Sequence, residues 1–107
     1  MRAYRVDRKK WAALDLFEQM GNIGSEVGRS LGAKRKGDEK TAEAAAGRAL
    51  DLFDATTEAW LHAASAARVR ELLRAKEQYL NSYYDSSAEN GIENYFMQFA
   101  VAARLRR

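Results

Sequence analysis

A row of acidic residues with the chain's single histidine could bind a metal ion or support acid–base catalysis. Asp51, Asp54, Glu58 and His62 are spaced by three, four and four residues, which places them on one face of a helix. A di-metal site in a helical bundle needs inward glutamates and paired Glu-x-x-His motifs, and the sequence has no such motif. The row lies opposite the apolar residues of the same segment. We therefore expect a solvent-exposed acidic face, with no metal and no cofactor.

Nucleophilic catalysis finds no better support in the residue types. The chain contains no cysteine, and no serine lies in a Gly-x-Ser-x-Gly turn. The glycine patterns that hold phosphates, Gly-x-Gly-x-x-Gly and Gly-x-x-x-x-Gly-Lys-Ser/Thr, are also absent. We expect a protein without enzymatic activity, whose function is binding.

Basic residues give the sharpest functional signal. In an up-down bundle the N-terminus, the second connection and the C-terminus meet at one end, and each of these segments is rich in cations. Tyr4 and Trp11 are interleaved with them and could stack on bases. Such an end is a footprint for the phosphates of RNA or DNA, although arginine-rich termini also occur as solvated tails that aid solubility. The residues of this predicted surface are Arg2, Arg5, Arg8, Lys9, Lys10, Arg68, Arg70, Arg104, Arg106 and Arg107.

Four glycines lie on one face of the first long predicted helix. Gly21, Gly24, Gly28 and Gly32 are spaced by three, four and four residues. Each costs a helix interior roughly 0.5–1 kcal/mol relative to alanine, so we expect a compensating close approach of another backbone or of a ligand. The face either packs against a helix of the same chain or of a second subunit, or forms a groove for a peptide or a nucleic-acid strand.

Composition and periodicity place these residues on helices. The 107-residue chain lacks proline, has a formal net charge of +3, and is long enough for a single domain spanning residues 1–107. No window is long and apolar enough for a membrane span or a signal peptide, so we expect a cytoplasmic protein without membrane contact. The apolar periodicity predicts an all-α fold, an antiparallel four-helix bundle.

Helix boundaries follow from capping residues. Residues 1–6 form an N-terminal arm, Asp7 caps a helix that ends at residues 34–37, and Asp38 caps the next helix. The third helix ends near Tyr84 and a fourth follows the turn after it. The weakest boundary is a break near residues 62–66. Without that break, one long helix would run through residues 38–84 and give a three-helix arrangement.

Two segments resemble a known family. The chain is similar in Asn22-Ile23-Gly24-Ser25-Glu26-Val27-Gly28-Arg29 and in Arg48-Ala49-Leu50-Asp51-Leu52 to bacterial four-helix-bundle proteins linked to intervening sequences of large-subunit ribosomal RNA, and to their relatives, the accessory proteins of diversity-generating retroelements. The resemblance implies a basic bundle that forms a ring, commonly of five subunits, and assists an RNA or a reverse transcriptase. No binding residue of that family is transferred to this chain.

We accordingly expect an oligomeric accessory protein that binds nucleic acid or a nucleic-acid enzyme complex. The alternative is a protein–protein adaptor, in which the glycine face and three aromatic residues expected to be exposed, Tyr83, Tyr84 and Tyr95, contact a partner helix. A third class is a bundle with a small-molecule site between its helices.

Overall fold

The computed structural model describes residues 5–63, 65–85 and 91–105, and within them the chain is all-α, with no strand. Five helices follow one another in the sequence: α1 (Arg8–Ala12), α2 (Leu16–Arg35), α3 (Glu39–Ala63), α4 (Ala66–Tyr84) and α5 (Ile92–Leu105).

The first predicted helix is divided into two. Asp7 caps α1 and accepts a hydrogen bond from the Lys10 N–H at 3.1 Å. Asp15 and Glu18 then form a reciprocal capping box, in which each side chain accepts the backbone N–H of the other, at 2.8 and 3.1 Å. The expectation of one continuous helix from Asp7 was therefore wrong, because the capping box starts α2 afresh.

The other predicted boundaries match the structure closely. Lys36 caps the C-terminus of α2, and Gly37 follows in the left-handed region with φ +76°. The break expected near residues 62–66 is confirmed, since α3 ends at Ala63 and α4 begins at Ala66. Ser65 caps α4 by accepting the Arg68 N–H at 3.3 Å. Residues 39–84 thus form two helices instead of one.

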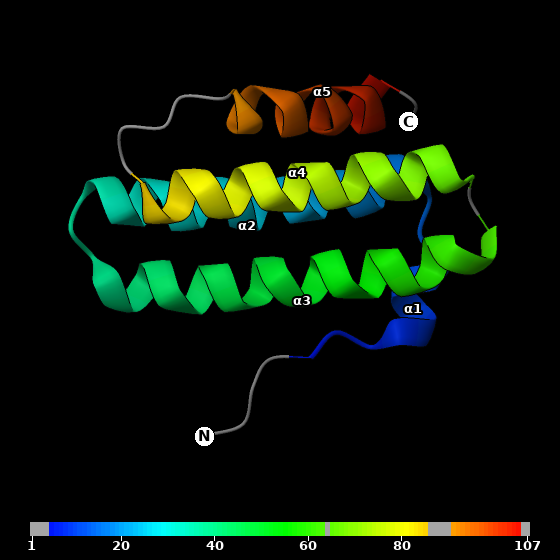
Figure 1. The fold of residues 1–107 in the computed structure, drawn as a ribbon, viewed down its shortest axis with the longest axis horizontal. Coiled ribbons are helices and arrows are strands. Elements are labelled where there is room, and N and C mark those ends of the chain that lie inside the picture. The colour runs from blue at the N-terminus through cyan, green and yellow to red at the C-terminus, as the bar shows by residue number, and fades with distance from the viewer. Residues whose placement is uncertain (1–4, 64, 86–90, 106–107) are drawn as a thin grey trace.

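The four long helices lie side by side in Figure 1, and each runs opposite to the one before it. Helix α2 packs against α3 and α5, and α3 packs against α4. Consequently the start of α2, the end of α3, the start of α4 and the end of α5 all lie at the end of the molecule that carries α1 (Figure 1). We call this the α1 end.

Aromatic residues from three helices meet in the core. Phe53 of α3 lies 6.1 Å from Tyr79 of α4 and 5.8 Å from Phe96 of α5, between ring centroids, and all three are fully buried. Rings at this separation contribute roughly 0.5–1.5 kcal/mol per pair beyond the area that they bury. The cluster fixes the positions of α3, α4 and α5 relative to one another.

Candidate nucleic-acid interface

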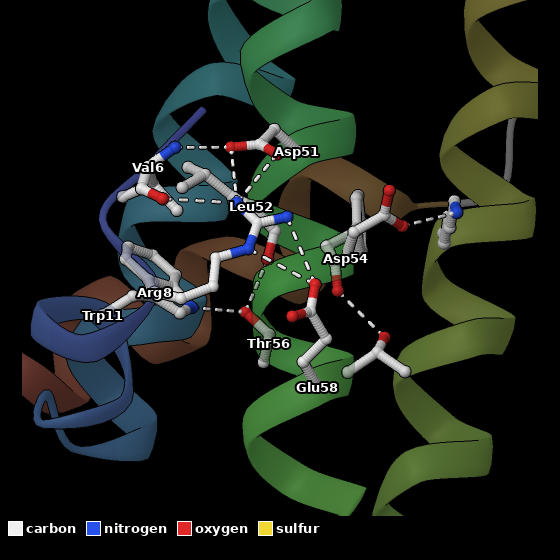
Figure 2. A network of polar contacts seen from close by, with 11 residues as sticks. Val6, Arg8, Trp11, Asp51, Leu52, Asp54, Thr56 and Glu58 are labelled. Atoms are coloured by element: carbon white, nitrogen blue, oxygen red, sulfur yellow. Dashed lines mark hydrogen bonds and ion pairs between the residues drawn. The ribbon is translucent and has the colours of Figure 1, made fainter. Parts of the chain in front are cut away.

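The N-terminal segment is fastened to α3 by a charged network, shown in Figure 2. The Arg8 Nη1 donates to both carboxylate oxygens of Asp51, at 2.9 and 3.0 Å, and the Arg8 Nη2 lies 3.2 Å from a Glu58 carboxylate oxygen. The backbone N–H of Val6 donates to the same Asp51 carboxylate at 2.7 Å. These hydrogen bonds to ionised groups raise the pKa of Arg8, against the desolvation of its guanidinium, and anchor α1 at a fixed place.

Trp11 completes the anchor from the apolar side. Its side chain is buried, and the indole Nε1–H donates to the Thr56 hydroxyl at 2.8 Å. Gln19 joins this residue to the second tryptophan, because its amide donates to the Trp11 carbonyl at 3.0 Å and accepts from the Trp60 indole at 2.9 Å. Trp11 and Trp60 therefore belong to one core. The prediction that Trp11 stacks on bases was wrong, since helix packing covers its ring.

The acidic row of α3 does not behave as one solvated face. Asp51 keeps only 10% of its side chain exposed, whereas Asp54 is 57% exposed and pairs with Lys76 of α4 at 3.1 Å. Glu58 forms an ion pair with Arg8, and His62 is exposed. The expectation of solvent exposure thus failed at Asp51, because the N-terminal segment folds back over it. Within the described residues, no three acidic or histidine side chains come together as metal ligands.

Five of the predicted basic residues are exposed at the α1 end, on three different helices. In contrast to Arg8, none of the five makes an ion pair with a described residue. Arg5 is also exposed, but it adjoins Val6, which contacts Asp51 near the middle of α3 and thus away from this end. Arg2, Arg106, Arg107 and Tyr4 lie outside the described residues. The five unpaired cations are Lys9 and Lys10 of α1, Arg68 and Arg70 of α4, and Arg104 of α5.

Carboxylates at the same end are held by hydrogen bonds within the chain. Asp7 caps α1, and Asp15 and Glu18 form the capping box of α2. Glu58 is paired with Arg8, and Glu71 accepts the Tyr95 hydroxyl at 2.7 Å. Burial and the hydrogen bond to this carboxylate raise the pKa of Tyr95. The sequence reasoning overlooked Asp15 and Glu18, which reduce the positive field here, but their oxygens are turned toward backbone donors.

The glycine face is divided between two environments. A β-carbon added at Gly21 would lie 3.7 Å from the Ala100 Cα, and one added at Gly24 would lie 2.7 Å from the Phe96 Cβ. This half of the face therefore lies against α5. At Gly28 it would meet no described atom within 4 Å, and at Gly32 only the Arg35 side chain at 3.8 Å. Close helix packing within the chain therefore accounts for the first two glycines.

A second polar cluster was missed from the sequence. Glu26 is only 9% exposed, although it is charged, and it forms ion pairs with Arg29 and with Arg48 of α3. Nearby, the Ser30 hydroxyl lies 2.6 Å from the Tyr79 hydroxyl, and burial raises the pKa of Tyr79 to about 12. The signal was present in the sequence as a Glu–Arg pair three residues apart beside the glycine row.

Two of the three aromatic residues proposed for an adaptor surface are buried or half-buried and have partners within the chain. Tyr83 is buried and lies under Lys34, whose Nζ is 4.8 Å from the ring centroid. Tyr95 is half-buried and bonded to Glu71. Only Tyr84 of the three is widely exposed, at 77%. The expectation of three exposed tyrosines was therefore wrong for Tyr83 and Tyr95.

Comparisons with protein families, curated proteins and solved structures identify no relative of this chain. None of the described helices has an apolar stretch long enough to cross a bilayer.

Proposed function

We propose that this protein is a non-enzymatic accessory protein that binds nucleic acid through the phosphate groups, using the α1 end. The observation that supports this most directly is the gathering of Lys9, Lys10, Arg68, Arg70 and Arg104, all exposed and without an ion-pair partner among the described residues. Lysine and arginine side chains that are free to reorient can follow a phosphate backbone without breaking contacts in the fold.

An antiparallel four-helix bundle is the finer architecture that this proposal assumes. In that arrangement the short helix α1 closes one end, and the network of Arg8, Asp51 and Glu58 holds α1 against α3, at the end of the molecule where α2 and α4 begin. Arg8 is thus a positioning residue and does not itself contact phosphate. Its guanidinium is already satisfied by two carboxylates.

The expected affinity is that of a sequence-independent interaction. No described aromatic ring at the α1 end is both exposed and placed among the cations, so base stacking contributes little. Binding through phosphates alone gives dissociation constants of about 10⁻⁴–10⁻⁶ M at physiological salt. If all five cations contact a single strand, the logarithm of the affinity falls with the logarithm of salt with a slope of about −3.5.

Protein contact is the second candidate, and a separate observation favours it. Met97, Val101 and Leu105 are spaced by four residues along α5 and are 57%, 40% and 80% exposed. A stripe of this kind marks a protein contact more often than isolated apolar residues do. The family resemblance implies a ring of subunits, and we propose that this stripe, with the open half of the glycine face at Gly28 and Gly32, mediates self-association or the contact with a reverse transcriptase.

Titration of fluorescently labelled single-stranded RNA and duplex DNA tests the nucleic-acid proposal. The titrations are made at 20 and at 150 mM salt, with the mass of the protein measured by light scattering on the same sample. Binding that weakens steeply with salt supports the proposal. Absence of binding at 20 mM salt refutes it, whatever the oligomeric state.

A further inference from the structure

A hollow of about 460 Å³ lies at the junction of α1, α2, α3 and α4. Its walls are largely apolar: Leu14 borders it from the connection between α1 and α2, Leu16 from the start of α2, and Trp60 from the end of α3. The volume lies in the range of about 300–1,000 Å³ that is typical of sites for small molecules. Of the residues that line the hollow, only Arg68 belongs to the five cations of the proposed nucleic-acid surface.

The polar side chains that line the hollow have hydrogen-bond partners, except for one charged group. The Gln19 amide uses its oxygen on Trp60 and its nitrogen on the Trp11 carbonyl. Arg68, by contrast, lines the hollow with a guanidinium that has no partner among the described residues. The carboxylate three residues further along α4, Glu71, accepts the Tyr95 hydroxyl at 2.7 Å and makes no ion pair with Arg68.

We propose that the hollow binds a small anionic amphiphile, a molecule with an apolar body and one carboxylate or sulfonate group. The body would displace water from Leu14, Leu16 and Trp60, and the anionic group would receive hydrogen bonds from Arg68. Charge complementarity selects this class over a neutral apolar molecule, because among the described residues that line the hollow the only ionic group is the Arg68 cation. A nucleotide base fits less well, since the amide of Gln19 is no longer free to read its edge.

Sodium decanoate, used below its micelle concentration, is the probe, and 1-decanol is its uncharged counterpart. In a ¹⁵N-labelled protein the indole N–H of Trp60 reports on the hollow, and that of Trp11, bonded to Thr56, serves as the internal reference. We expect decanoate to shift the Trp60 signal saturably and to bind about tenfold more tightly than decanol, as a charge-assisted hydrogen bond allows. Absence of a saturable shift at Trp60 overturns the proposal.

Two arginines two residues apart on α4 provide a matched pair of variants. Arg68→Gln should remove the preference for decanoate over decanol, whereas Arg70→Gln should leave it unchanged, because Arg70 does not line the hollow. Equal weakening by both variants would mean general attraction to a basic surface and would contradict the site.

Filling the hollow separates this inference from the proposed function. Ala63 is exposed and lines the hollow, so Ala63→Phe should abolish decanoate binding and leave nucleic-acid binding intact. Ala12→Leu, at another exposed lining residue, provides the same test if the first variant does not fold. Decanoate binding that survives in a folded filled variant contradicts the site, and it leaves the nucleic-acid proposal untouched.

Discussion

Gly24 of α2 faces Phe96 of α5 so closely that a β-carbon at residue 24 would lie 2.7 Å from the Phe96 Cβ. That atom is attached to the backbone of α5, so it cannot move away by a change of rotamer. The glycine therefore sets the distance between two helices. Phe96 in turn packs on Phe53, which connects this contact to the aromatic core.

Gly24→Ala should destabilise the fold, even though alanine favours helices by about 0.5–1 kcal/mol over glycine. The overlap with Phe96 must be relieved by separating α2 from α5, and overpacking of this kind costs about 1–3 kcal/mol. Gly47→Ala is the control, because Gly47 is exposed on α3 and its added β-carbon meets nothing within 4 Å. Urea unfolding should show a loss for the first variant and a gain for the second. Equal gains would show that α5 does not press on Gly24.

Asp51→Asn should loosen the N-terminal segment from α3. The change removes the ion pair with Arg8 and weakens the hydrogen bond from the Val6 N–H, at a carboxylate only 10% exposed, and we expect a loss of about 1–3 kcal/mol in the free energy of unfolding. Asp54→Asn breaks an exposed pair with Lys76 and should cost less than about 1 kcal/mol. Hydrogen exchange of the α1 amides distinguishes local release from global unfolding. Unchanged protection of α1 in Asp51→Asn would contradict the anchoring role.

Alkaline pH should destabilise the protein through its buried tyrosine. Burial raises the pKa of Tyr79 to about 12, so between pH 10 and 12 the unfolded chain loses this proton while the folded chain keeps it. Stability is fully present below pH 10 and falls by about 1.4 kcal/mol per pH unit above it for each such group. Burial raises the pKa of Tyr83 too, which steepens the fall.

Tyrosine variants separate this effect from the titration of lysines. Tyr79→Phe should flatten the decline of the unfolding free energy between pH 10 and 11.5, compared with Tyr84→Phe, whose side chain is 77% exposed. The measurement is urea unfolding at several pH values. A decline of the same slope in both variants would show that Tyr79 does not keep its proton in the fold.

Sequence periodicity predicted the helical class and the break at residues 62–66, because Ser65 is a cap and the apolar pattern fits helices on either side. The interruption before Leu16 was also encoded locally, by Asp15 and Glu18, but a hydrophobic period that continues across residues 11–20 concealed it. The burial of Glu26 does not follow from the periodicity of its own helix, because its partner Arg48 comes from α3.

The candidate interface was predictable only as a list of cations. The prediction that basic segments meet at one end depends on the order of the helices, and five of the predicted residues are exposed in the structure: Lys9, Lys10, Arg68, Arg70 and Arg104. Arg8 could not be distinguished from its neighbours, because its partners lie 43 and 50 residues away in the sequence. Pairing between distant segments decides which charges stay free, and that depends on tertiary structure.

The salt dependence of single-stranded RNA binding tests the central claim most directly, with two variants of equal charge. Lys9→Gln/Lys10→Gln removes two cations from the α1 end, and Lys36→Gln/Lys40→Gln removes two exposed lysines from the opposite end. We predict that the first variant binds more weakly at 50 mM salt, with a slope against salt less steep by about 1.4, and that the second retains the wild-type slope. Equal slopes in the two variants, or binding lost equally in both, would contradict a phosphate-binding surface at the α1 end.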